Sequence, residues 1–225
     1  MSMAMVMRLI WKDWYLNRAG ILISLIGGMA TLGLVAASRG SKIAVILGLI
    51  IVATILIGMG AMVMASAISE RKQQTLTFVM SLPISYWEYT TAKIAGSLLI
   101  FLVLWTAMLA DMVATILLAP GFAHGLIPFV VIMSVEILMS TCLVTAVAVT
   151  TESQGWTVGA AQVGALSLNG IGWWIVRFPD IGGMMTSATM RWSSTATALL
   201  TVELAAIALM IAITFFVQAR KRDFV

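Results

Sequence analysis

Six long runs of apolar residues occupy most of this 225-residue chain, and short polar breaks separate them. A helix needs roughly 20 apolar residues to cross the hydrocarbon core of a bilayer, and each run is long enough to do so. The predicted spans are 20–38, 43–68, 94–119, 126–150, 157–178 and 195–217. The pattern therefore predicts an all-α integral membrane protein with six transmembrane helices in a single domain, residues 1–225.

The basic residues are distributed unevenly between the two sides that these spans define. With a cytoplasmic N-terminus, the outer side holds Arg39, Lys42, Arg177 and Arg191. The inner side holds the other nine of the 13, which are Arg8, Lys12, Arg18, Arg71, Lys72, Lys93, Arg220, Lys221 and Arg222. Lysine and arginine concentrate on the cytoplasmic side of membrane proteins. The sequence thus predicts that both termini and the polar stretch at about 69–92 are cytoplasmic.

An amphipathic segment at about 5–18 precedes the first span. Met7, Ile10, Trp11 and Trp14 recur at helical spacing, with polar residues between them. A helix of this kind lies in the headgroup plane of a membrane. We expect an interfacial helix at the cytoplasmic surface; a simple aromatic anchor for the first span is the alternative.

The polar stretch between the second and third spans has the pattern of a short helix followed by a break. Ser69 suits an N-cap for a helix that begins at Glu70, and the apolar residues at 76, 79 and 80 follow at helical spacing. Pro83 stops a helix because it lacks an amide hydrogen. Ser85 and Glu88 then form a capping box for a second helix that continues through Lys93. The pattern predicts a rigid cytoplasmic element, and an ordinary interfacial loop stays open as the alternative.

This stretch resembles the signature region of type-2 ABC transporter permeases, the membrane subunits of many bacterial exporters. The matching residues are Glu70, Arg71, Thr75, Leu76, Leu82, Pro83, Ser85 and Lys93. The six spans, the amphipathic opening and a polar outer segment before the last span extend the resemblance over nearly the whole chain. Tyr86 is a departure, because the family often has a basic residue there.

The resemblance implies a mechanism and a set of partners. The element after span two would be a coupling helix docked on an ATP-hydrolysing subunit, with contacts from Glu70, Arg71, Thr75, Leu76, Val79, Met80 and Pro83. The chain has no phosphate-binding loop of the G-x-x-x-x-G-K-[ST] type. ATP and Mg would therefore be bound by two copies of a separate ATPase, and this chain would pair with an identical or paralogous permease in a bacterial inner membrane. Peptide, lipid, drug and ion export all fit.

Three carboxylates lie inside apolar runs: Asp111, Glu136 and Glu203. Ionisable groups at such depth are costly and usually face a bundle interior or water. They are candidates for an acidic translocation path that suits a cationic or amphipathic substrate. Hydrogen bonding to neighbouring polar groups is the structural alternative. A proton relay would instead make the chain a proton- or ion-coupled secondary transporter, which is the leading rival to the exporter.

Small residues in the fifth run indicate close helix packing. Gly155 and Gly159 form a G-x-x-x-G pair, and Gly164 follows. These glycines could pack within one subunit or across a dimer, and in the family spans one and five commonly make the dimer contact. The segment at about 178–194 corresponds to one that folds back into the outer leaflet in the family, with Gly182 and Gly183 at its turn; a plain outer loop is the alternative.

Composition excludes several other classes. The chain is 61% hydrophobic and 10% charged, with one cysteine and one histidine. Disulfide frameworks, histidine metal clusters and HExxH proteases are therefore excluded. The basic residues flank apolar runs instead of forming a soluble basic face, so no nucleic-acid partner is expected. Membrane lipid is the expected surrounding, and catalysis by this chain is not expected.

Overall fold

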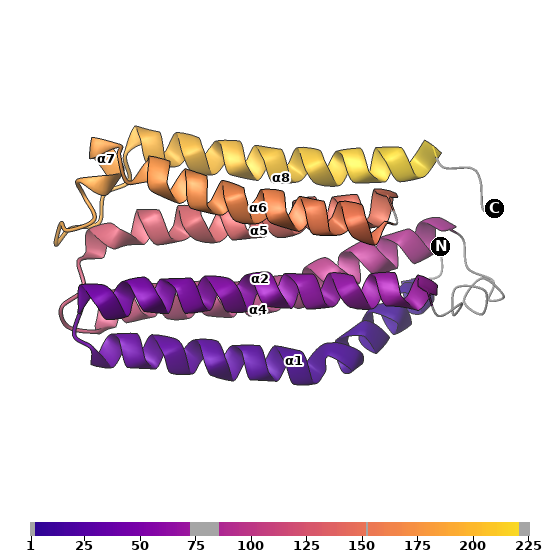
Figure 1. Cartoon of the computed structure of the whole chain (residues 1–225), viewed down its shortest axis with the longest axis horizontal. Coiled ribbons are helices and arrows are strands. Elements are labelled where there is room, and N and C mark those ends of the chain that lie inside the picture. Colours follow the sequence, from indigo (N-terminus) through magenta and orange to yellow (C-terminus); the bar gives the residue numbers. More distant parts are fainter. Residues whose placement is uncertain (1–2, 73–85, 152, 221–225) are drawn as a thin grey trace.

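The computed structural model describes residues 3–72, 86–151 and 153–220, and all regular structure in these ranges is helical. The helices are α1 (Met3–Ala37), α2 (Lys42–Lys72), α4 (Tyr86–Leu118), the 3-10 helix η1 (His124–Leu126), α5 (Ile127–Thr151), α6 (Gln154–Ile175), α7 (Pro179–Gly182) and α8 (Ser194–Arg220). The long helices run side by side along one axis (Figure 1). The start of α1 and the end of α8 lie at the same end of the bundle, which we call the terminal end. Helix α7 lies at the opposite end, which we call the α7 end (Figure 1).

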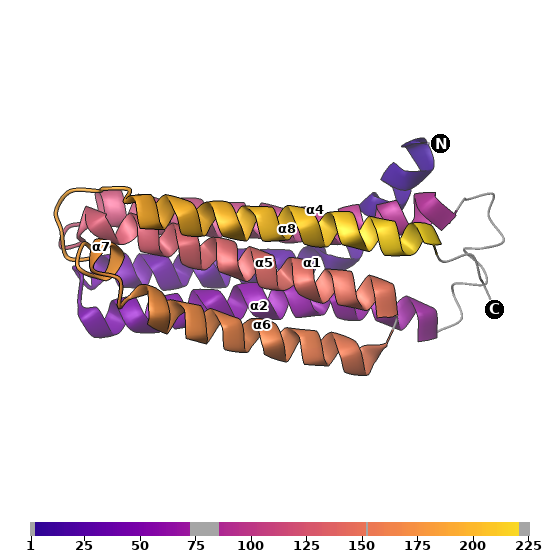
Figure 2. The same cartoon turned by 90° about the horizontal axis from the view of Figure 1, so that it is seen from above.

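Helix α5 is the centre of the bundle. It packs against α2, α4, α6 and α8, while α1 packs against α2 and α4. Figure 2 shows α5 between α8 and α6. In the most apolar stretch of each helix, 61% of the residues are buried in α5 and 11% in α8. The peripheral helices therefore present most of their apolar surface to the surroundings, as membrane helices do.

Five helices are long and apolar enough to cross a membrane among the residues that the structure describes. They are Ile10–Ala37, Ile43–Met62, Ile94–Leu118, His124–Thr151 and Ser194–Gln218. The prediction of six spans is thus not confirmed, because α6 does not reach the required apolarity. Its 22 residues include Gln154, Gln162 and Asn169 as well as several glycines, which dilute its hydropathy. It is nonetheless a helix packed along α5.

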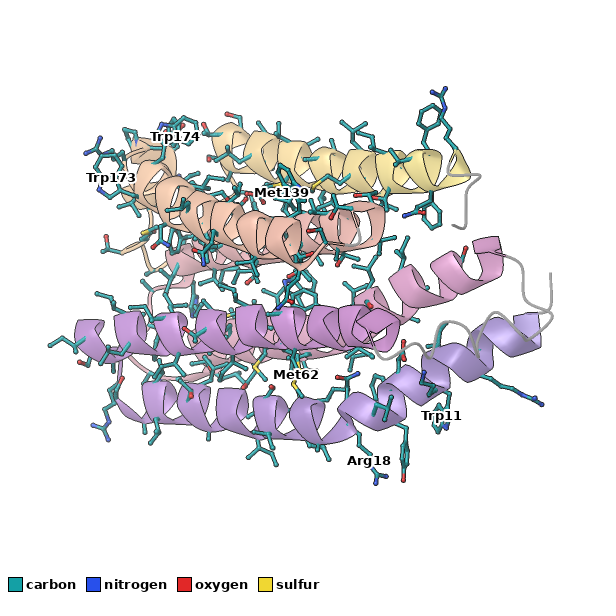
Figure 3. The ribbon with its side chains drawn as sticks, turned by 45° about the vertical axis from the view of Figure 1, so that its right-hand side comes forward. Trp11, Arg18, Met62, Met139, Trp173 and Trp174 are labelled. Atoms are coloured by element: carbon teal, nitrogen blue, oxygen red, sulfur yellow. The ribbon has the colours of Figure 1, made fainter. Side chains whose placement is uncertain are left out.

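The interfacial helix expected at about 5–18 is not a separate element. Helix α1 continues without a break from Met3 to Ala37, because no proline or other helix-stopping residue separates the two predicted parts. Its N-terminal part is inclined to the remainder and carries Trp11 (Figures 1 and 3). Trp11 is 69% exposed, whereas Trp14 packs against the core. The predicted apolar stripe is therefore divided between an exposed and a packed side.

The predicted helix start at Ser69 is also wrong. Helix α2 runs through Ser69, Glu70 and Arg71 to Lys72 as one continuous element. Serine and charged residues do not stop a helix that already has its preceding turns. The remaining predicted contact positions, 75, 76, 79, 80 and 83, lie outside the described residues. Helix α4 begins at Tyr86 and continues through Lys93 to Leu118, which confirms a helix that runs into the third span.

Two connecting turns touch at the α7 end. Gly40 and Gly121 both have positive φ angles, +79° and +94°, which favour glycine. A Cβ atom on Gly40 would collide with the carbonyl of Gly121, and one on Gly121 with the carbonyl of Arg39. The α1–α2 turn and the connection that follows α4 are thus in direct backbone contact.

The segment between α6 and α8 contains one short helix, α7, followed by turns. Ile181 of α7 is buried in a cluster with Ile132, Ile175 and Ala196. The amide of Gly125 donates a hydrogen bond to the carbonyl of Ser187, with N and O 3.0 Å apart. This segment therefore covers the ends of α5 and α8. Whether it enters a lipid leaflet stays a prediction.

Candidate functional site

An apolar groove of about 400 Å³ lies between α2 and α6, with α5 beneath it. Its size falls within the range of roughly 300–1,000 Å³ for small-molecule sites. Its lining residues come from α2, α5 and α6, with one from α4; they are Leu49, Ile50, Val52, Ala53, Thr54, Leu56, Ile57, Met112, Phe129, Val130, Met133, Ser134, Ile137, Leu168, Asn169, Gly172 and Trp173. None of these described residues carries a charge.

The groove exists because two helices packed on the same side of α5 diverge. Helix α6 packs against α5, and so does α2. Val52, Leu56 and Val130 in the groove are at most 2% exposed, so its floor belongs to the packed core. A second cavity of about 40 Å³ shares Ile57, Ile137 and Leu168 with the groove and extends to Val144 and Ala161. The space between α2 and α6 therefore runs along much of α5.

Polar groups in the groove are tied locally. The Thr54 hydroxyl donates to the Ile50 carbonyl at 2.7 Å, and the Asn169 amide donates to the Ala165 carbonyl at 2.8 Å. The Ser134 carbonyl accepts a hydrogen bond from the Trp105 indole at 2.7 Å. Because these groups are bonded within the helices or between α4 and α5, the groove presents a mainly apolar wall.

Aromatic and basic residues gather at the α7 end of this groove. Trp173, which lines it, lies beside Trp174 at the end of α6 (Figure 3). The Arg177 guanidinium carbon is 3.3 Å from the centroid of the Trp173 ring. Trp174 and Phe178 meet edge to face, with centroids 4.5 Å apart. Tryptophan and arginine in this position are typical of a membrane–water interface.

Another face of α5, towards α8, holds a pair of buried carboxyl groups. Glu136 on α5 is fully buried, and Glu203 on α8 is 6% exposed. Each lies nine residues from the α7 end of its helix, about 13 Å along it. The two groups lie close enough to interact electrostatically. The Ser167 hydroxyl of α6 donates to Glu136 Oε1 at 2.6 Å. Glu136 thus connects α5 with α6 and lies near α8.

The hydrogen bonding of this pair is incomplete. Glu136 Oε2, Glu203 Oε2 and Ser140 Oγ are buried without a hydrogen-bond partner among the described residues. Burial of a polar group without a partner costs about 1–3 kcal/mol by mutational data. One of these three groups, Ser140, also lines the second cavity of about 40 Å³.

The three predicted path carboxylates do not form one site. Glu136 and Glu203 lie close together, while Asp111 on α4 is partly exposed and has no hydrogen bond or ion pair to another described residue. None of the three lines the groove. The sequence predicted the buried acids from their depth and missed the groove, because divergence of α2 from α6 leaves no pattern in the residues.

The predicted packing glycines separate into two kinds. Gly164 is buried, and a Cβ atom there would lie 2.5 Å from the Ser140 hydroxyl. Gly159 has no neighbouring atom within 4 Å, and Gly155 has only Ser153 of its own helix start. Gly164 therefore serves packing inside the chain, while the G-x-x-x-G pair is on an exposed face of α6.

Among the predicted coupling residues, the structure describes the backbone of Glu70 and Arg71 only. They lie in the last turn of α2, at the terminal end of the bundle (Figure 1). Helix α4 starts at the same end. The end of α2 and the start of α4 therefore lie at the end of the bundle where α1 begins and α8 ends.

The apolar helices, the groove and the buried acids define a multi-pass helical membrane protein. The family model described as ABC-2 type transporter matches residues 3–169, which cover α1 to most of α6. The chain belongs to this family and is the membrane subunit of an ABC transporter, which confirms the resemblance read from the sequence. Comparison with curated proteins and with solved structures finds no match.

Proposed function

We propose that this chain is the permease of an ATP-driven bacterial exporter and works as a dimer with a separate ATPase. The observation that carries the proposal is the family match across α1 to α6, including the connection between α2 and α4. Two ATPase copies would bind ATP and Mg, and this chain would supply the translocation path without catalysing a reaction.

We propose that the protein lies in the inner membrane of a bacterium, with the terminal end of the bundle on the cytoplasmic side. Most lysines and arginines of the sequence belong to that end. Counting α6 as a sixth crossing returns the chain to its starting side, in agreement with the start of α1 and the end of α8 lying at the same end (Figure 1). The segment after α6 then lies at the outer surface and shields the exit.

The proposed ATPase contact is the cytoplasmic connection at about 69–92. Continuity of α2 through Arg71 supports this role, because a rigid helix transmits a displacement of its end into the membrane. Glu70 and Arg71 would make polar contacts, residues 76, 79 and 80 would seat the element, and Pro83 would set the angle to α4.

The proposed dimer contact includes the exposed face of α6. Gly159 has open space above it and Gly155 meets only Ser153 of its own helix start, and close approach of a second helix requires small residues of this kind. Trp156 and Val163 on the same helix are 69% and 57% exposed. The partner is an identical chain or a paralogue.

Charge reversal at the end of α2 tests the proposal. We expect the double variant Glu70→Lys with Arg71→Glu to lose the ATPase in pull-down and to uncouple hydrolysis from transport. Loss of a charge contact at an interface typically costs about 2–5 kcal/mol, enough to empty a micromolar complex. Leu76→Asp should act in the same way.

A matched control reverses two charges at the opposite end, Arg39→Glu with Asp180→Lys, and should retain the ATPase. Membrane insertion of every variant is checked first. If both test variants retain the ATPase and full transport, the connection at about 69–92 is an ordinary loop. The main support for ATPase coupling would then be lost.

A further inference from the structure

The α7 end of the groove combines an apolar wall with a basic rim. Leu49, Phe129, Met133 and Trp173 are among the lining residues. Trp173 also carries the Arg177 guanidinium on its ring face, 3.3 Å from the centroid. A stacked guanidinium keeps its in-plane N–H groups free to donate, because the ring contacts only its face. The apolar groove and the free N–H donors of Arg177 thus adjoin each other at Trp173.

The groove differs from an ordinary lipid-facing wall in its shape. Exposed faces such as that of α8 are convex, whereas this groove has a floor of core residues and two helix walls. Leu56 and Val130 at the floor are 0% and 2% exposed. Its one lining amide, Asn169, is bonded to its own helix. A flexible apolar chain fits such a cavity without leaving a polar group unsatisfied.

The net charge of the connections at the α7 end favours a negative partner. The connections at the α7 end carry Arg39, Arg177 and Arg191 against one acidic residue, Asp180. Asp180 Oδ2 accepts a hydrogen bond from Thr195, 3.2 Å away. No ion pair joins Arg177 to another described residue. Guanidinium donors match phosphate and carboxylate oxygens in geometry as well as charge.

We propose that the groove binds an anionic amphiphile taken from the bilayer, with its apolar chain between α2 and α6 and its headgroup at Arg177. This inference names a substrate class for the proposed exporter, so its relevance to transport rests on that proposed function. Binding itself needs only the groove and its rim. The acids Glu136 and Glu203 take no part, since neither lines the groove.

Photolabelling in nanodiscs tests binding on the full chain. The probes are a phosphatidylglycerol and a phosphatidylcholine that carry the same diazirine-bearing acyl chain, each at low fraction in unlabelled phosphatidylcholine. Labelled peptides are mapped by mass spectrometry. We expect the anionic probe to label residues 49–57 and 168–173 about tenfold more than the neutral probe, the size of one charge-assisted hydrogen bond.

Two variants separate the headgroup from the chain. Arg177→Gln should abolish the preference for the anionic probe, while Arg191→Gln, a basic residue outside the groove, should retain it. Ala53→Phe fills the groove and should lower labelling there several-fold for both probes. Ala208→Phe on the exposed face of α8 is the matched control and should change nothing in the groove.

Three results would overturn the proposal. Equal labelling by both probes in the wild-type chain removes the anionic headgroup. Undiminished labelling in Ala53→Phe removes the groove as the site. Crosslinks between two copies of the chain across residues 49–57, with no lipid label, would assign the groove to a dimer contact. ATPase pull-down from the same preparations keeps the tests distinct, because a retained ATPase with failed labelling leaves the proposed function standing.

Discussion

Two faces of α5 have opposite surroundings, one closed and polar and the other open and apolar. Towards α6 and α8 the helices close around Glu136 and Glu203, leaving at most 6% of either residue exposed. Between α2 and α6, by contrast, they leave a groove of about 400 Å³ among apolar residues. In lipid an open apolar surface loses little, because lipid tails are as apolar as leucine, whereas a carboxyl exposed to them is costly. The helices therefore pack closely where they carry carboxyl groups and can stand apart where their side chains are apolar.

The difference also separates two roles that the sequence had joined. A buried acid in a transport protein suggests a path, yet Glu136 bonds one helix to another and the path-like space is apolar. Ser167 bonds Glu136 across α5 and α6, and Trp105 bonds Ser134 across α4 and α5. Such contacts specify which helix faces meet, a task that apolar contacts alone perform poorly in lipid.

The largest expected effect comes from overpacking the contact between α5 and α6. Gly164→Leu places a side chain against Ser140 and should lower stability by about 3 kcal/mol, at the upper end for overpacking. The apparent melting temperature in nanodiscs should fall by several degrees. Gly159→Leu, on the exposed face of the same helix, should leave that temperature unchanged and weaken crosslinking between copies. Equal melting temperatures for the two variants would contradict the distinction.

A smaller effect is expected from breaking the carboxyl contact. Ser167→Ala removes the partner of Glu136 Oε1 and should cost about 1–3 kcal/mol in the same melting assay. Asn169→Ala, whose amide bonds only within its own helix, is the control and should cost less. The double variant Ser167→Ala with Glu136→Met should recover part of the loss, because position 136 then carries no buried oxygen without a partner. If Ser167→Ala melts like the wild-type chain, the contact does not hold α6 to α5.

The smallest effect concerns transport. Single changes Asp111→Asn, Glu136→Gln and Glu203→Gln should leave most ATP-driven transport intact, because none of the three lines the groove and ATP supplies the work. Ala53→Phe should reduce transport instead, since it occupies the groove. Flux into inside-out vesicles with and without ATP measures both. Abolished transport in any acid variant, with lost proton coupling in vesicles that lack ATP, would favour a secondary transporter.

The helices could be predicted from the sequence, and their mutual arrangement could not. Runs of apolar residues located α2, α4, α5 and α8 to within a few residues at the α7 end. Predicted interruptions at Ser69 and before Gly20 were wrong, because capping residues mark where a helix can begin and do not stop one already formed. The lower apolarity of α6 was visible in its glycines and polar residues.

The site required coordinates for a physical reason. A membrane helix is apolar on the face that meets lipid and on the face that meets its neighbours, so its residues give no direction. The apolar runs predicted that Glu136 and Glu203 lie within the membrane, but not that these two lie close together while Asp111 stands apart. The groove depends on α2 and α6 both packing on α5 while diverging above it.

The contact between Gly40 and Gly121 has a mechanical consequence. It sets the turn after α1 directly against the connection after α4 through backbone atoms, which do not yield as side chains do. If α2 and α4 are displaced at the terminal end, the two turns can move closer no further at the far end. The helices would then move most where the force enters. Opening the α7 end would require both glycine turns to part together, so that end would be the last to yield.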